Sequence, residues 1–87
     1  MDDAQGAAPN PLRAVVEVVV RALVDNPEAV RIAESQRRGV VMLELTTAPG
    51  DMGKIIGRQG RTVSALRTLV ALTAEKHGQR AQLDLRD

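Results

Sequence analysis

Hydrophobic residues recur every three to four positions between residues 12 and 23, which predicts an amphipathic helix near the N-terminus. Asn10 is a residue type that caps helices, and Pro11 suits the first helical position. The same spacing predicts a long helix that begins at Arg61. The apolar positions expected to face the core are Leu12, Val15, Val16, Val19 and Leu23 on the first helix and Val63, Leu66, Leu69 and Val70 on the long helix.

Apolar and polar residues alternate between and after these two helices, which predicts strands. Residues 28–35 and 40–46 are expected to form two strands joined by a turn at 36–39, and residues 81–85 a third strand. A short helix is expected at 51–56. The predicted fold is therefore α+β with the order α-β-β-α-α-β. Two helices between the second and third strands permit those strands to pair in parallel, which makes the sheet mixed.

Residues 1–9 combine acidic residues, glycine and alanine without periodicity, so we predict a flexible N-terminal tail followed by one domain over residues 10–87. The N-terminus carries Asp2 and Asp3 in place of a basic segment, and no apolar run is longer than four residues. Neither a signal peptide nor a membrane span is expected, and we predict a cytoplasmic protein.

Composition restricts the chemistry. Phe, Tyr and Trp are absent, which argues against modules that stack bases on aromatic side chains, such as RNA-recognition motifs and OB-folds. Cysteine is also absent and His77 is the single histidine, so we expect no disulfide, no metal site and no cofactor. No combination of residues suits a catalytic centre, and we predict that the protein is not an enzyme.

Positive charge is concentrated in one segment although the net charge is only +1. Residues 52–74 contain Lys54, Arg58, Arg61 and Arg67 and no acidic residue, whereas the rest of the chain is net negative. A local excess of cations is typical of a surface that binds phosphate groups. The charge distribution therefore predicts that a phosphate-binding surface lies within residues 52–74.

Two glycines, Gly57 and Gly60, bracket Arg58 and Gln59 just before the long predicted helix. Glycine can adopt left-handed torsions, and N–H groups at the start of a helix attract anions. The alternative is a tight helix-to-helix turn in which the glycines only permit chain reversal. Neither the P-loop pattern nor the dinucleotide-binding pattern fits these letters.

The residues around this loop read GKIIGRQGRTV over positions 53–63, and this run resembles the signature of a KH domain. The stretch 53–69 resembles the small single-KH bacterial proteins of the KhpA family, and the element order matches over roughly 10–85. The resemblance implies a type II KH domain, with a three-stranded mixed sheet and three helices on one face. It further implies a GXXG loop that clamps about four nucleotides of single-stranded RNA.

A role as an RNA chaperone or post-transcriptional regulator is likewise implied by the resemblance. So is pairing, either as a homodimer or as a heterodimer with another KH-containing RNA-binding protein. Two alternatives stay open: a protein-interaction adaptor with a vestigial GXXG loop, and a protein that binds single-stranded DNA.

The expected RNA-binding residues fall into three groups. The loop glycines permit close approach, Arg58 meets phosphate, and Gln59 contacts the RNA backbone or a base edge. Aliphatic side chains are expected to line the groove, and the alternative is that they belong wholly to the core. Flanking cations are expected to attract phosphate, and the alternative is that they only form a solvated surface. The complete set is Lys54, Ile56, Gly57, Arg58, Gln59, Gly60, Arg61 and Val63, with Arg37 and Arg38 in the hairpin turn expected to grip the strand from the opposite side.

Three valines of the first helix, Val18, Val20 and Val24, lie outside its predicted apolar stripe. Exposed apolar residues on a small domain indicate a partner surface, although single surface valines are common. We therefore expect self-association through this helix.

Overall fold

A computed structural model describes residues 10–86, and its helices and strands follow the predicted order. The predicted tail, residues 1–9, lies outside the described residues. Two short 3-10 turns accompany the main elements. The elements are α1 (Pro11–Leu23), the turn η1 (Pro27–Ala29), β2 (Arg31–Arg37), β3 (Val40–Thr46), α2 (Met52–Ile56), the turn η2 (Arg58–Gly60), α3 (Arg61–Lys76) and β4 (Arg80–Arg86).

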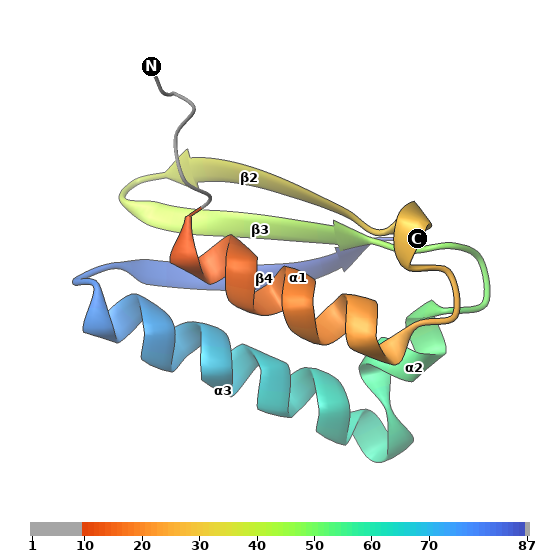
Figure 1. Cartoon of the computed structure of the whole chain (residues 1–87). Coiled ribbons are helices and arrows are strands. Elements are labelled where there is room, and N and C mark those ends of the chain that lie inside the picture. Colours follow the sequence, from red (N-terminus) through yellow and green to blue (C-terminus); the bar gives the residue numbers. More distant parts are fainter. Residues whose placement is uncertain (1–9, 87) are drawn as a thin grey trace.

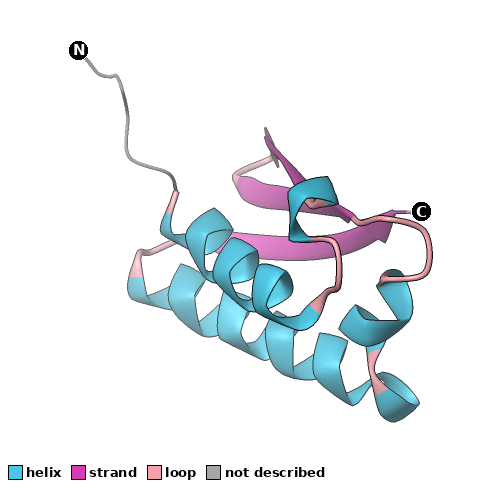
Figure 2. Ribbon diagram, turned by 45° about the vertical axis from the view of Figure 1, so that its right-hand side comes forward, coloured by secondary structure: helices cyan, strands magenta, loops and turns pink. Residues whose placement is uncertain are grey.

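The sheet has the strand order β2-β3-β4, and the helices cover one of its faces (Figures 1 and 2). β3 pairs antiparallel with β2 and parallel with β4. It is the most apolar strand, and its buried residues Val41, Leu43 and Leu45 alternate with half-buried ones. A central strand covered by helices on one face shows this pattern. The predicted type II KH arrangement is confirmed.

The first helix begins as predicted but buries a different stripe. The side chain of Asn10 accepts a hydrogen bond from the Leu12 N–H at 2.9 Å, and proline occupies the first turn. Val20 and Val24 are buried, so the prediction that they lie outside the apolar stripe of this helix is wrong. Leu23 is 40% exposed, so the prediction that it belongs to that stripe is also wrong. Positions spaced by four stay close to one line along a helix. Two neighbouring rows of this helix are equally apolar, and only packing on the sheet selects between them.

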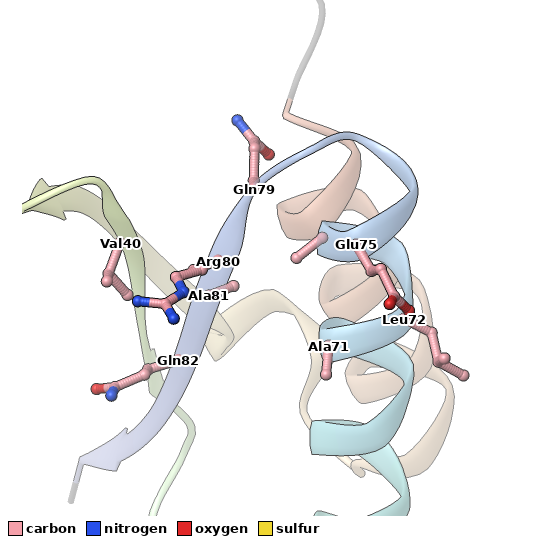
Figure 3. A pocket seen from close by; sticks show the side chains of 9 residues that line it. Val40, Ala71, Leu72, Glu75, Gln79, Arg80, Ala81 and Gln82 are labelled. Atoms are coloured by element: carbon pink, nitrogen blue, oxygen red, sulfur yellow. The ribbon is translucent and has the colours of Figure 1, made fainter.

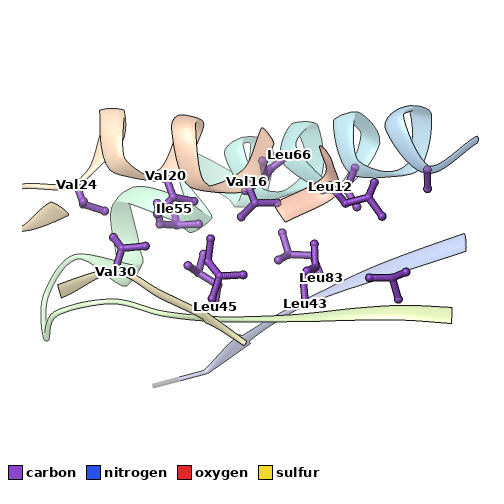
Figure 4. Packing of buried hydrophobic residues seen from close by; sticks show 14 residues of the cluster. Leu12, Val16, Val20, Val24, Val30, Leu43, Leu45, Ile55, Leu66 and Leu83 are labelled. Carbon is purple, nitrogen blue, oxygen red and sulfur yellow. The ribbon is translucent and has the colours of Figure 1, made fainter. Parts of the chain in front are cut away.

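The long helix α3 shows a similar correction. Val63, Leu66 and Val70 are buried as predicted, but Leu69 is 44% exposed and Ala74 takes a core position in its place. Figure 4 shows these helices and the sheet enclosing one aliphatic layer. Its labelled members come from α1, β3, α2, α3 and β4 and from the segments on either side of η1, and are Leu12, Val16, Val20, Val24, Val30, Leu43, Leu45, Ile55, Leu66 and Leu83.

The hairpin also differs from the prediction. Residues 27–29 form a 3-10 turn, so the first strand starts at Arg31 and continues to Arg37. The turn contains only Arg38 and Gly39, with φ values of 54° and 79°. Two-residue hairpin turns with positive φ at both positions match the right-handed twist of the flanking strands. The broader predicted turn at 36–39 is therefore wrong.

Candidate nucleic-acid interface

The glycine loop joins α2 to α3 at the end of the domain where β3 and β4 finish (Figure 1). Three of its four residues have positive φ: Gly57 at 76°, Gln59 at 56° and Gly60 at 72°. The loop closes on itself, since the Gly60 N–H donates to the Gly57 carbonyl at 3.1 Å. The fold thus uses left-handed torsions at both glycines, as the sequence predicted.

Gly57 is required for a second reason, which is space. A Cβ atom at this position would overlap the Thr62 side chain, whereas a Cβ at Gly60 would meet nothing within 4 Å. Gly57 also has ψ at 174°, and this combination of torsions is essentially limited to glycine. The chain therefore passes so close to the first turn of α3 that only glycine fits there.

The start of α3 is open to an anion. Gly60 occupies the N-cap position and has no side chain to satisfy the N–H groups in the first turn of this 16-residue helix, of which the Arg61 N–H already donates to the Arg58 carbonyl. Arg58 and Gln59 are exposed immediately before it, and Arg61 is exposed in its first turn. Unsatisfied N–H groups beside arginine side chains suit phosphate oxygens.

Lys54, one of the cations expected to attract RNA, already forms ion pairs with two carboxylates. Its ammonium group lies 3.2 Å from a carboxylate oxygen of Asp25 and 3.6 Å from one of Asp51. The hydrogen bond to Asp25 and the charge of that carboxylate raise the pKa of Lys54, and Asp51 adds to the effect. Because Asp25 and Asp51 lie outside residues 52–74, the charge count along the chain did not reveal them. Lys54 therefore contributes less free positive charge than Arg58 or Arg61.

Asp51 is a site residue that sequence reasoning missed. Its side chain is buried and accepts hydrogen bonds from the Asn26 N–H at 3.0 Å, the Asn26 amide at 3.2 Å and the Asp25 N–H at 3.4 Å. Burial alone would raise the pKa of Asp51, but these hydrogen bonds and the charge of Lys54 together lower it. The carboxylate thus ties the segment after α1 to the start of α2, which carries the loop. An aspartate as the first residue of the predicted short helix was the only available signal.

The aliphatic residues beside the loop divide into two kinds. Ile55 is fully buried and Val63 is nearly so, which makes both part of the core. Ile56 is 40% exposed next to Gly57, where its side chain is accessible to a base. The structure therefore leaves Ile56 as the accessible member of the predicted pair Ile56 and Val63.

The remaining arginines lie farther from the loop. Arg67 donates from two guanidinium nitrogens to the Leu83 carbonyl, both at 3.2 Å, and so links α3 to the edge strand β4. Arg37 and Arg38 lie at the hairpin, at the opposite end of the sheet from the glycine loop (Figure 1). The 16 residues of α3 span about 24 Å between these ends. The fold does not bring the hairpin arginines and the loop together.

Two features are absent from residues 10–86. No group of three or more histidine or acidic side chains in this part of the chain could hold a metal ion. No helix within the same residues is long and apolar enough to cross a membrane.

Comparison with known proteins gives a consistent family assignment. The family model described as "KhpA/KhpB, KH domain" matches residues 13–85. The chain is 43% identical over 76 residues to the RNA-binding protein KhpA of Halalkalibacterium halodurans, covering 87% of this chain and 100% of that protein. It is 44% identical over 71 residues to the RNA-binding protein KhpA of Caldanaerobacter subterraneus, covering 82% and 95%. The RNA-binding protein KhpA of Aquifex aeolicus is 39% identical over 74 residues, covering 85% and 94%.

Proposed function

Because the chain belongs to the KhpA/KhpB KH-domain family, we propose that it binds single-stranded RNA and catalyses no reaction. The observation that carries this proposal is the glycine loop, in which left-handed torsions expose the uncapped start of α3 beside Arg58 and Arg61. Within residues 10–86 neither arginine forms an ion pair, so both charges are available to phosphate. The relatives named above are themselves called RNA-binding proteins.

The grip we propose covers about four nucleotides, the usual footprint of a GXXG loop. Phosphates lie against Arg58 and the remaining N–H groups at the start of α3, while the Arg61 side chain adds attraction from the first turn of that helix. Gln59 contacts the RNA backbone or a base edge, and Ile56 supports a base without an aromatic ring. Lys54 adds a weaker attraction because Asp25 shares its charge.

A single domain with such a small footprint binds weakly, and a second KH domain raises the apparent affinity for longer RNA. We propose that the chain pairs with a second copy or with another KH-containing RNA-binding protein. Two of the valines first expected to form the partner surface are buried, but Val18 is 70% exposed and Leu72 of α3 is 56% exposed. Sedimentation equilibrium at tens of micromolar tests homodimerisation, and a strictly monomeric mass would leave only the heteromeric form of this proposal.

A role as an RNA chaperone or post-transcriptional regulator is implied by the family resemblance alone, and it stays a prediction. So does the cytoplasmic location. An adaptor function with a vestigial loop, or a preference for single-stranded DNA, is an alternative outcome of the next experiment.

The test replaces Arg58→Asp and Gln59→Asp together and measures binding to fluorescent random-sequence RNA and DNA oligomers of four nucleotides. Two carboxylates at an exposed loop repel phosphate and bury nothing, so we expect a folded protein that has lost RNA binding. The matched control is Arg13→Asp with Ala14→Asp, which changes the charge equally in the first turn of α1, where acids suit the helix dipole.

Wild-type RNA affinity in the loop variant, with an unchanged circular dichroism spectrum, would refute the loop grip and favour the adaptor. Tighter binding of the wild-type protein to DNA than to RNA would favour the single-stranded DNA alternative. Loss of binding in the control as well would show that total charge, and not the loop, determines affinity.

A further inference from the structure

The ion pair between Asp25 and Lys54 joins two parts of the chain beside the glycine loop. Asp25 follows α1, and Lys54 lies in α2, three residues before Gly57. The two charged groups are 3.2 Å apart, and their side chains are 74% and 42% exposed. Within residues 10–86 Lys54 is the only cation that pairs with Asp25. The pair is therefore open to solvent at the end of the molecule that carries the loop (Figure 1).

The backbone, and not the pair itself, fixes the position of Asp25. The buried carboxylate of Asp51 accepts hydrogen bonds from the backbone N–H of Asp25 at 3.4 Å and from that of Asn26 at 3.0 Å. The same carboxylate lies 3.6 Å from the Lys54 ammonium group. Because the aspartate side chain is short and its backbone is held, the Asp25 carboxylate stays near Lys54 when the ammonium group turns away.

Affinity at the glycine loop depends on free cations because the loop lies on an open surface. Arg58, Gln59 and Arg61 are exposed. A hollow of about 560 Å³ lies elsewhere, between the last turns of α3 and the start of β4, and no loop residue lines it (Figure 3). Each cation that becomes available to a phosphate adds a contact and releases counterions. The state of Lys54 therefore affects how tightly the loop holds RNA.

The Asp25–Lys54 pair is weak enough for a phosphate to replace Asp25. An ion pair between exposed side chains changes an equilibrium constant by no more than about fivefold. The ammonium group is a point charge on a flexible stem, so it can turn to a carboxylate or to a phosphate. Arg58 and Arg61 have no such competitor, since neither forms an ion pair within residues 10–86.

We propose that Asp25 competes with RNA phosphate for Lys54 and so keeps RNA binding at the glycine loop weaker than the local cations alone would make it. Lys54 stays with Asp25 when a short RNA is bound. Removal of the Asp25 carboxylate frees Lys54 for one further phosphate contact. Asp25 is thus a positioning residue that acts through Lys54 and does not itself contact RNA. This proposal rests on the RNA binding proposed above.

The competing explanation is that any acidic residue near the loop repels RNA at a distance. Glu28 distinguishes the two explanations, because it is exposed, lies three residues after Asp25 and forms no ion pair within residues 10–86. Glu28→Gln changes the net charge as Asp25→Asn does, but it frees no cation. It is therefore the matched control. Asparagine at position 25 also keeps the backbone N–H that donates to Asp51.

The experiment measures fluorescence anisotropy of a random-sequence RNA tetranucleotide with the full chain, and circular dichroism confirms that each variant is folded. We expect Asp25→Asn to bind about fourfold more tightly than wild type, within the range of an exposed ion pair. One further phosphate contact also makes the log–log salt slope steeper by about 0.7 for a single strand. Glu28→Gln should change the affinity by less than about twofold, because salt screens distant charges, and should leave the slope unchanged.

A double-mutant cycle with Lys54→Gln gives the decisive measurement. In the wild-type background this substitution removes a cation that is already paired, and we expect binding to weaken by about twofold. In the Asp25→Asn background it removes a phosphate contact, and we expect a loss of about eightfold. Once Lys54 is absent, Asp25→Asn should therefore have no larger effect than Glu28→Gln. Equal effects of Lys54→Gln in both backgrounds would show that the charges act independently and would overturn the proposal. Equal effects of Asp25→Asn and Glu28→Gln would also overturn it.

Failure of the loop grip has a different signature. If the variant with Arg58→Asp and Gln59→Asp loses binding while Asp25→Asn behaves like wild type, the loop grip stands and the competition for Lys54 is wrong. If that loop variant binds like wild type while Asp25→Asn tightens binding only when Lys54 is present, the loop grip is wrong and the competition stands. Absence of RNA binding by wild type and by every variant would overturn both.

Discussion

Replacing Gly57 by alanine is the sharpest test of the loop geometry. The backbone there has φ 76° and ψ 174°, and the added Cβ would overlap the Thr62 hydroxyl and lie 2.6 Å from the Thr62 Cβ and 3.0 Å from its amide nitrogen. Every residue has the amide nitrogen, and every residue except glycine has the Cβ. Thr62→Ala therefore relieves only part of the overlap, and the backbone must move.

Two contributions set the magnitude. A non-glycine residue in this region of torsion space costs about 1–3 kcal/mol. Forcing extra atoms into a filled space costs about another 1–3 kcal/mol. We therefore expect Gly57→Ala to lower the free energy of unfolding by about 2–6 kcal/mol, out of a total of roughly 4–13 kcal/mol for a domain of this length.

Gly60→Ala is the matched control, because its φ of 72° is similar but its Cβ would meet nothing within 4 Å. Only the cost of a left-handed residue remains, about 1–2 kcal/mol. Circular dichroism during urea and thermal unfolding suits a chain without aromatic residues. The melting temperature falls by about 4–8 °C for each kcal/mol in a domain of this size. Equal destabilisation by the two substitutions, or a loss below about 1 kcal/mol for Gly57→Ala, would refute this reasoning.

Three further outcomes are expected. The pKa of Asp51 is lowered from 3.8, so its carboxylate stabilises the fold above pH 3.8 and this stabilisation is lost as the pH falls through the pKa of the folded state. We therefore expect Asp51→Asn to lower the melting temperature at pH 7 and to lose less stability than wild type between pH 4 and 2. Parallel pH profiles of the two proteins would contradict this. Leu66→Ala should cost about 2–5 kcal/mol in urea unfolding and the exposed Leu69→Ala within about 0.5 kcal/mol, so similar costs would contradict the packing of α3. RNA tetranucleotide binding should show a log–log salt slope of about −2 to −3, set by three or four phosphate contacts, and a slope near zero would contradict phosphate clamping.

Local signals were sufficient for the order of elements and for the glycine loop. These signals each act within a few residues, so they can be recognised from the sequence without knowledge of the fold. They are the capping pair at the start of α1, the alternation in β3 and the glycines around Arg58. The bounds of β3 were predicted as observed, because a breaker stands on each side of an unbroken apolar alternation.

Features that depend on distant partners were not predictable. Val20 and Leu23 are both apolar and lie on neighbouring rows of α1, and only the position of the sheet decides which is buried. The pair between Lys54 and Asp25 joins residues that are far apart in the chain, as does the alignment of Arg37 with Arg80 through β3. Charge counted along the sequence treats all of these residues as independent.

The parallel pairing of β3 with β4 has a consequence for the order of folding. Its partners, from Val40 with Arg80 to Thr46 with Arg86, are about forty residues apart, whereas the β2–β3 hairpin closes through two residues. Local contacts form before distant ones because a long loop must lose more entropy to close. The hairpin can therefore form early, but β3 becomes a central strand only when β4 docks. The glycine loop lies within the segment that this last step closes, so we expect the geometry proposed to hold RNA to be complete only when the sheet is complete.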